Sequence, residues 1–151
     1  MKRRIFLSGT GAFAAFSALP TLGVGPPKSV QVFKSPSCGC CNGWVAHMRS
    51  AGFDVRVIEV HSAAFERKRL GMPERFGSCH TSTVDGYVLE GHVPADVVKR
   101  LLAARTKAIG LAVPNMAPGS PGMEMSERND PYQVLLIDPA GQASVYASYP
   151  K

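Results

Sequence analysis

The sequence has little of what marks several large classes of protein. Only four of its 151 residues are cysteine, too few for a disulfide-dense scaffold and too many for a thiol-free chain. Its 17 basic and 11 acidic side chains give a net charge of +6, but they form no Lys/Arg stripe. The first 27 residues hold three basic and no acidic side chains, so without them the charge falls by three, to +3. This weak charge excludes nucleic acid as the expected partner.

The start of the chain is typical of an export signal. Lys2, Arg3 and Arg4 are followed by a moderately apolar stretch that contains glycine and ends near Leu19. This stretch is too short for a membrane anchor, and the paired arginines resemble a twin-arginine signal. We therefore expect residues 1–27 to direct export to a bacterial periplasm, with no stable membrane insertion after their removal. Residues 28–151 show no internal repeat, and their length fits a single domain.

The first two thirds of this domain alternate between strand-like and helix-like patterns. Strand-like runs at residues 30–33 and 53–60 flank a helical stretch that Asn42 would cap and Gly52 would end. Ser62 predicts the start of a second helix, and Asp85-Gly86 predicts a tight hairpin between residues 81–84 and 87–90. A third helix begins near Pro94 and ends at Gly110. A strand–helix–strand start implies a parallel pair, so the predicted fold is α/β and thioredoxin-like, in the order βαβαββα.

The last third of the chain has a different composition. Residues 111–131 are rich in proline, glycine and methionine, which precludes a long helix or strand. We expect this segment to form an ordered lid or a flexible loop. Residues 134–137 and 143–146 flank a turn at Asp138-Pro139-Ala140-Gly141 and predict a C-terminal β-hairpin.

Three of the four cysteines lie within four residues, in Cys38-Gly39-Cys40-Cys41. Cys38 and Cys41 form a Cys-x-x-Cys pair at a helix N-terminus, where the helix dipole lowers thiol pKa values. This pattern predicts a thiol oxidoreductase with these two residues as its catalytic pair. Cys40 crowds the pair, however, and three adjacent thiolates suit a soft metal such as Cu(I) better than a two-thiol shuttle.

The fourth cysteine, in Cys79-His80, directly precedes the third predicted strand. In ordinary thioredoxin-like proteins this position carries a cis-proline that lies against the two active-site cysteines, and this sequence has no proline there. We therefore expect Cys79 and His80 to face the other cysteines. The predicted metal ligands are Cys38, Cys40, Cys41, Cys79 and His80. The alternative is a structural disulfide between Cys79 and one of the other three cysteines.

Other side chains fit a copper site less directly. Met116 and Met123 lie in the proline-rich segment, from which a thioether could close over the thiols. His92 lies just before the third predicted helix, where capping of that helix is the alternative to metal binding. Cu(I) takes Cys, Met and His ligands, which favours copper. Zinc is the competing metal, because four thiols also bind it tetrahedrally.

Four blocks of sequence, at residues 38–44, 78–81, 90–95 and 110–124, resemble the CopG-like periplasmic copper-resistance family. These are predicted metal-binding proteins with a Cys-x-Cys-Cys motif, once classed as a domain of unknown function. The resemblance extends from about Val30 to Tyr149. It implies a thioredoxin-like fold with added loops, a Cys-x-Cys-Cys copper site and a role in copper handling of an oxidoreductase type. It also implies metal ions and other periplasmic copper-resistance proteins as partners.

Overall fold

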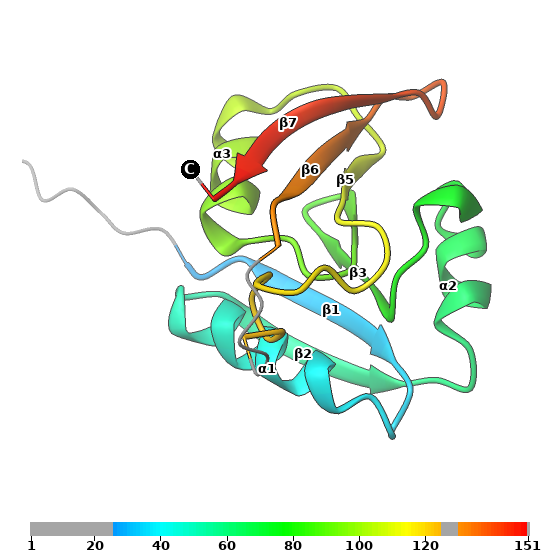
Figure 1. Cartoon of the computed structure of the whole chain (residues 1–151), viewed down its shortest axis with the longest axis vertical. Coiled ribbons are helices and arrows are strands. Elements are labelled where there is room, and N and C mark those ends of the chain that lie inside the picture. Colours follow the sequence, from blue (N-terminus) through cyan, green and yellow to red (C-terminus); the bar gives the residue numbers. More distant parts are fainter. Residues whose placement is uncertain (1–25, 125–129, 151) are drawn as a thin grey trace, which may run out of the picture.

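The computed structural model describes residues 26–124 and 130–150, which form one mixed sheet with helices on both faces (Figure 1). The predicted export signal lies outside the described residues, except for its last two positions. Within the described part, no helix is long and apolar enough to cross a membrane. The elements are β1 (Ser29–Lys34), α1 (Gly39–Ser50), β2 (Asp54–Glu59), α2 (Ala63–Arg69), η1 (Glu74–Phe76), β3 (His80–Val84), β4 (Tyr87–Glu90), α3 (Ala95–Ala104), β5 (Gly110–Ala112), β6 (Tyr132–Ile137) and β7 (Ala143–Tyr149).

The seven strands lie in the order β2-β1-β3-β4-β5-β6-β7. β1 pairs in parallel with β2, and β4 with β5, while the other neighbours are antiparallel. The predicted parallel pair at the start of the chain is therefore confirmed. The predicted order of elements through α3 is also confirmed, with η1 added between α2 and β3.

Both predicted hairpins are present, and each follows from its turn residues. Asp85 and Gly86 both have positive φ angles, +49° and +86°, as a two-residue type I′ turn requires. The C-terminal hairpin pairs β6 with β7 and turns at Asp138, whose side chain accepts hydrogen bonds from the backbone N–H groups of Ala140 and Gln142.

The ends of two helices differ from the prediction. The first helix begins at Gly39, before Asn42, because a turn closed by the Cys38 N–H and the Ser35 carbonyl already puts Cys38 at the N-cap. Cys40 and Cys41 therefore lie in the first helical turn. The third helix ends at Ala104, well before Gly110, because Arg105 adopts a left-handed conformation. Strand β5, which was not predicted, then begins at Gly110.

Two hydrophobic cores lie on opposite faces of the sheet. The first packs α1 and α3 together through Trp44, Val45, Met48, Val97, Val98 and Leu101. The second, on the other face, is smaller and packs Met72 and Phe76 against the strands. Neighbouring strand residues alternate between the two cores: Leu89 faces the first and Val88 the second. The first core fixes the N-terminal end of α1 relative to the sheet.

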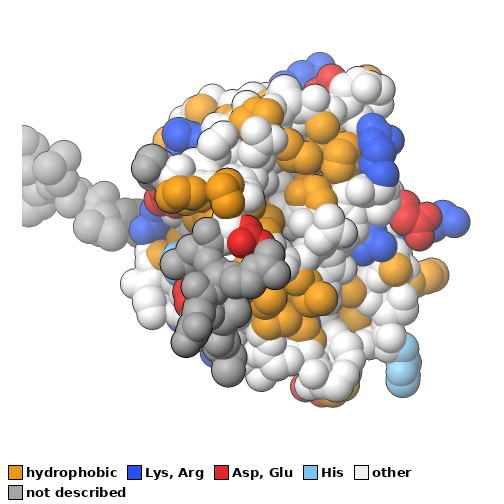
Figure 2. Space-filling model, in the orientation of Figure 1, with side chains coloured by type: hydrophobic (Ala, Val, Ile, Leu, Met, Phe, Trp, Pro, Cys, Tyr) orange, Lys and Arg blue, Asp and Glu red, His pale blue; other side chains and the backbone are white. Residues whose placement is uncertain are grey.

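Charged and hydrophobic side chains are interspersed on one face of the molecule (Figure 2). On the face drawn in Figure 2, Lys and Arg side chains lie apart from one another, with small hydrophobic groups between them. The exposed large hydrophobic side chains include Phe65, Met116 and Val145.

We predict that Leu101→Ala lowers the free energy of unfolding by about 2–5 kcal/mol, because it leaves a cavity between α3 and the sheet. Leu102→Ala is the matched control, since the next side chain along α3 is only partly buried. Denaturant titration of both variants measures the difference. Equal losses would contradict the described packing of α3.

Candidate metal centre

Strand pairing brings three separate parts of the chain to one end of the sheet. β1 and β3 are antiparallel with Lys34 opposite His80, so the segment after β1 lies beside the segment before β3. β3 and β4 form a hairpin, so the segment after β4 begins at the same end. These three segments carry the Cys-x-Cys-Cys motif, Cys79 and His92 respectively. The topology therefore assembles the site from residues that are distant in sequence.

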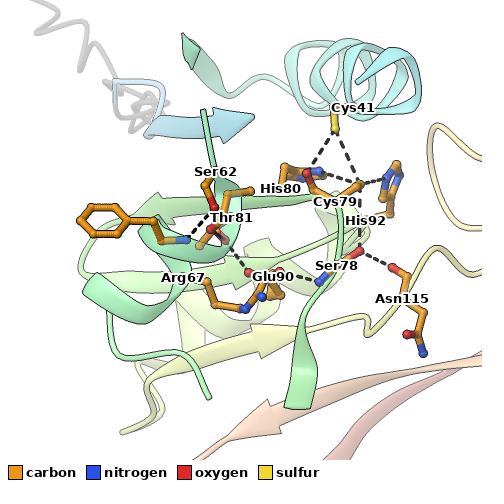
Figure 3. Close-up of polar contacts among 12 residues, drawn as sticks. Cys41, Ser62, Arg67, Ser78, Cys79, His80, Thr81, Glu90, His92 and Asn115 are labelled. Carbon is orange, nitrogen blue, oxygen red and sulfur yellow. Dashed lines mark hydrogen bonds and ion pairs between the residues drawn. The ribbon is translucent and has the colours of Figure 1, made fainter. Parts of the chain in front are cut away.

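The four sulfur atoms lie within 4.8 Å of one another. Cys79 Sγ is 3.6 Å from Cys41 Sγ and 3.9 Å from Cys40 Sγ, and Cys38 Sγ is 3.6 Å from Cys40 Sγ. Two imidazoles adjoin Cys79 (Figure 3). We call the six residues the thiol site: Cys38, Cys40, Cys41, Cys79, His80 and His92.

Cys38 and Cys41 form a disulfide, with their Cα atoms 5.5 Å apart, while Cys40 and Cys79 are free thiols. The alternative that places Cys79 in a disulfide with another cysteine is therefore wrong, because the Cys-x-x-Cys spacing at the start of α1 lets Cys38 and Cys41 pair with each other. Cys41 is fully buried and Cys38 is partly exposed. Cys38 is thus the sulfur of the pair that a reagent in solution reaches first.

The orientation of His92 is set by a backbone carbonyl. His92 Nδ1 lies 2.7 Å from the Pro121 oxygen, which can only accept a hydrogen bond, so Nδ1 carries the proton. Nε2 is left with a free lone pair and lies 3.0 Å from Cys79 Sγ. Burial lowers the pKa of His92, which favours this neutral form. Metal-binding histidines are commonly oriented in this way, by a hydrogen bond from the nitrogen that does not bind the metal.

The Pro121 carbonyl is held in place by a close contact between two backbones. Gly122 has a φ of +88°, and a Cβ atom there would lie 2.5 Å from Trp44 N and 2.9 Å from the Cys40 oxygen. On the helix side, a Cβ on Gly43 would lie 2.9 Å from Gly122 Cα. Only glycine permits this approach. Within the predicted lid or loop segment, 111–131, residues 117–123 therefore form an ordered loop over the start of α1, while residues 125–129 lie outside the described residues.

His80 is buried between the thiols and the core. Its Nδ1 lies 3.4 Å from Cys79 Sγ, and its ring centroid lies 4.5 Å from that of Trp44. Among the described residues, Nε2 has no hydrogen-bond partner. Burial, with smaller contributions from His92 and Lys34, lowers the pKa of His80 to about 3, so its ring is neutral at physiological pH. A proton on Nδ1, directed at the Cys79 sulfur, leaves Nε2 as a bare acceptor.

Cys79 is a protonated thiol in the metal-free protein. Burial raises its pKa to about 12, and the nearby Cys40 thiol adds to the effect. Its proton can be donated to His92 Nε2, the acceptor at 3.0 Å. A cation bound here must displace that proton, because the thiolate is the form that ligates metals. The Cys79 sulfur and the His92 nitrogen thus point toward a shared position.

Two overlapping groups of donor atoms could hold a metal ion. One consists of the four cysteines, and the other of Cys79, His80 and His92, so Cys79 belongs to both. Neither group contains a carboxylate. Sulfur with imidazole suits Cu(I) or Zn²⁺, whereas Mg²⁺ and Ca²⁺ prefer oxygen ligands.

Some of the predicted site residues lie together in the thiol site, and the two methionines lie elsewhere. All four cysteines, His80 and His92 lie in the thiol site, and His92 was predicted there only as an alternative to helix capping. Met116 is 52% exposed at the surface, and Met123 lies partly buried in the loop over α1. Metal binding by any of these residues stays a prediction.

Sequence reasoning missed three groups that shape the site. The Pro121 carbonyl orients His92, the Trp44 ring packs on His80, and the buried Glu90 contacts the segment around Cys79. A backbone carbonyl leaves no signal in a sequence. Glu90 does have a sequence signal. It ends an apolar strand directly before Gly91-His92, a position that is unusual for an exposed acidic residue.

Two solved structures are similar to this chain over most of its length. The chain is 44% identical to two structures of a copper resistance protein, copG, in forms 2 and 1. Form 2 matches with a TM-score of 0.78 over 82% of this chain and 99% of that one, and form 1 with 0.77 over 83% and 99%. Residues 76–123 match the family described as protein of unknown function DUF411. The chain belongs to the CopG-like DUF411 family.

The residues that match the DUF411 family include part of the thiol site. Cys79, His80, His92 and the loop over α1 all lie within residues 76–123. In the described ranges, 26–124 and 130–150, the fold is a mixed α/β arrangement of one seven-stranded sheet and three α-helices. No curated protein matches the chain.

We predict that His92 in the metal-free protein carries its proton on Nδ1, because its partner there is a carbonyl. Gly122→Ala pushes the loop away from α1 and removes this preference. The matched control is Gly86→Ala, which strains an equally positive φ angle where a new Cβ meets nothing within 4 Å. Nitrogen-15 NMR of the imidazole reports the tautomer, and a proton on Nε2 in the unmodified protein would contradict the assignment.

Proposed function

We propose that the protein binds copper, as Cu(I), in the thiol site and acts in periplasmic copper handling or resistance. The observation that carries this proposal is the convergence, from three separate segments, of four sulfurs within 4.8 Å of one another and of two imidazoles within 4.8 Å of the Cys79 sulfur. Scattered cysteines in a core would not produce such a convergence. Two structures at 44% identity are titled as a copper resistance protein, which supports the same conclusion.

The chemistry of the donors favours Cu(I) over zinc. Cu(I) is a soft ion that thiolates select, and the site offers more sulfur than nitrogen. A copper ion bound by Cys79 and His92 would also find Cys40 and Cys41 within reach. The proline-rich loop over α1 would exclude water from the bound metal. Zinc is the alternative metal, since four thiolates also satisfy its tetrahedral preference.

Full use of the thiol site requires reduction of its disulfide. While Cys38 and Cys41 are bonded to each other, only Cys40, Cys79 and the two imidazoles offer free donor atoms. Two electrons and two protons convert the pair to thiols, and deprotonation then supplies two further thiolates. We therefore expect Cu(I) to load most fully under reducing conditions.

The proposal includes a location and a fold relationship. The twin-arginine-like start of the chain supports export to the periplasm, where disulfides form and persist. A thioredoxin-like relationship is supported by the strand order β2-β1-β3-β4 and by a Cys-x-x-Cys disulfide at the start of α1. Cell fractionation tests the location, and retention in the cytoplasm would contradict it.

We predict that the reduced protein binds at least one equivalent of Cu(I), and that Cys79→Ser weakens binding about 10- to 100-fold or more, because Cys79 belongs to both donor groups. His61→Gln, at an exposed histidine outside the site, is the control and leaves binding unchanged. Competition with a Cu(I) chelator gives the affinity, and X-ray absorption at the copper edge counts sulfur and nitrogen neighbours.

Two results would contradict copper binding at this site. One is a copper content below one equivalent after reductive loading. The other is a content that Cys38→Ser and Cys41→Ser leave unchanged. Full displacement of Cu(I) by equimolar Zn²⁺ would instead assign the site to zinc.

A second function, thiol–disulfide exchange, is favoured by one observation: the site holds a disulfide whose partly exposed sulfur belongs to Cys38. In the reduced protein the Cys38 thiolate would attack a substrate disulfide and release one substrate thiolate. The Cys41 thiolate would then attack the Cys38 sulfur, release the second substrate thiolate and restore the Cys38–Cys41 disulfide. The two functions use the same sulfurs.

We predict that metal-free protein catalyses disulfide exchange only if both members of the pair are present. Cys38→Ser removes turnover, because the accessible nucleophile is lost, whereas Cys40→Ser keeps it. A reduction-potential titration and a turnover assay with a small-molecule disulfide measure these effects. Metal-free protein that exchanges no disulfide would leave copper binding as the function.

A further inference from the structure

Glu90 is a fully buried acidic side chain that no step of the proposed function uses. It lies at the end of β4, two residues before His92. Its Oε1 accepts hydrogen bonds from the Ser78 N–H at 2.6 Å and from Arg67 Nη1 at 3.0 Å. Its Oε2 accepts a hydrogen bond from the Thr81 hydroxyl at 2.6 Å. A buried carboxylate with this many donors is held in a single position.

The partners of Glu90 enclose two residues of the thiol site. Ser78 and Thr81 stand immediately before and after Cys79-His80, and one carboxylate binds both (Figure 3). The backbone of Glu90 also leads directly to His92 through Gly91. Glu90 therefore connects the segment that carries Cys79 to the segment that carries His92, the two residues whose donor atoms lie 3.0 Å apart.

Packing around this connection leaves little room for movement. A Cβ atom on Gly91 would lie 2.5 Å from Ser78 Oγ and 2.6 Å from the Val113 carbonyl oxygen. On the other side, a Cβ atom on Gly77 would lie 2.8 Å from the Arg67 guanidinium carbon. The Ser78 hydroxyl also donates to the Asn115 carbonyl. The segment before Cys79 is thus fixed on both sides.

Arg67 supplies the charge that this buried carboxylate needs. Its side chain is 9% exposed, that of Glu90 is 0% exposed, and the pair links α2 to the sheet. A buried acid without a cationic partner is strongly destabilising, so each member of the pair depends on the other. A second ion pair on the same helix, Arg69–Glu66, reaches the surface, and within the described part of the chain its side chains form no hydrogen bond or ion pair with the thiol site.

We propose that Glu90, paired with Arg67, is a positioning residue that holds Cys79 against His92 before metal arrives, so that the thiol site is preorganised for its ion. This inference rests on the proposed function for the identity of the ion, Cu(I). Its structural part, the placement of the Cys79 sulfur, exists without metal. Two measurements therefore separate the two claims.

The first measurement needs no metal. In Glu90→Gln an amide nitrogen, which donates, replaces one carboxylate oxygen, so it cannot accept from both Arg67 and Thr81 as Glu90 does. Freed from this restraint, Cys79 is expected to become more accessible and to react faster with iodoacetamide relative to Cys40, its internal reference. Glu66→Gln, the same change on the exposed ion pair, leaves this ratio as in the unmodified protein. Mass spectrometry of the oxidised protein, with Cys38 and Cys41 still paired, gives the ratio.

The second measurement is Cu(I) affinity in a double-mutant cycle. Glu90→Gln is expected to weaken Cu(I) binding about 10- to 100-fold, the range for outer partners of metal ligands, with a changed copper-edge spectrum. Because Glu90 acts through Cys79, the loss disappears in the Cys79→Ser background. Thr81→Val, which removes one of the three hydrogen-bond donors and keeps the side-chain shape, gives a smaller change of the same sign and serves if Glu90→Gln does not fold.

The outcomes distinguish the two proposals. An unchanged alkylation ratio in both Glu90→Gln and Thr81→Val overturns the positioning role, whatever the protein binds. Equal losses of Cu(I) affinity with and without Cys79 overturn it as well, since they indicate general destabilisation. A changed ratio in a protein that binds no Cu(I) supports the positioning role and contradicts only the proposed function.

Discussion

The position of one sulfur atom, that of Cys79, is the constraint on which the site depends. It lies 3.6 Å from Cys41 Sγ in the first turn of α1 and 3.0 Å from His92 Nε2 beyond β4. Neither neighbour is close in sequence. The antiparallel pairing of β1 with β3 brings the first one near, and the β3–β4 hairpin the second. Any shift in strand register would move Cys79 away from both, so the sheet topology and the site chemistry are one constraint.

Most buried polar groups of the site have hydrogen-bond partners, but one ring nitrogen lacks a partner among the described residues. His92 donates to Pro121, and the carboxylate of Glu90 is surrounded by donors, but His80 Nε2 is buried with no partner among the described residues. An unpaired buried polar atom costs about 1–3 kcal/mol. Favourable packing in the surrounding core, including Trp44 on the His80 ring, offsets that cost. The ring nitrogen on the other side of His80, Nδ1, faces the thiol site and lies 3.4 Å from Cys79 Sγ.

Sequence signals predicted the local structure well and the contacts of the site poorly. Asp85-Gly86 and Ser62 each fix backbone geometry through their own side chain or conformation, so the hairpin and the start of α2 were predictable. Strand β5 has only three residues and depends on pairing with β4, which no short pattern records. The approach of Cys79 to the other thiols followed from the expected topology. The Pro121 carbonyl and the Glu90 network depend on tertiary packing alone.

Copper binding and disulfide formation compete for the same atoms. The two sulfurs of the Cys38–Cys41 disulfide are not thiolates, the form that binds metal, while Cys40 and Cys79 remain free thiols beside them. A metal that binds thiolates at Cys38 and Cys41 therefore stabilises the reduced pair, and by linkage an oxidising environment weakens that metal's affinity. The partly buried Cys79 thiol, which pairs with neither, would remain a ligand in both states. The proposed copper binding and the proposed thiol exchange therefore both depend on the equilibrium between the oxidised and reduced Cys38–Cys41 pair at the start of α1.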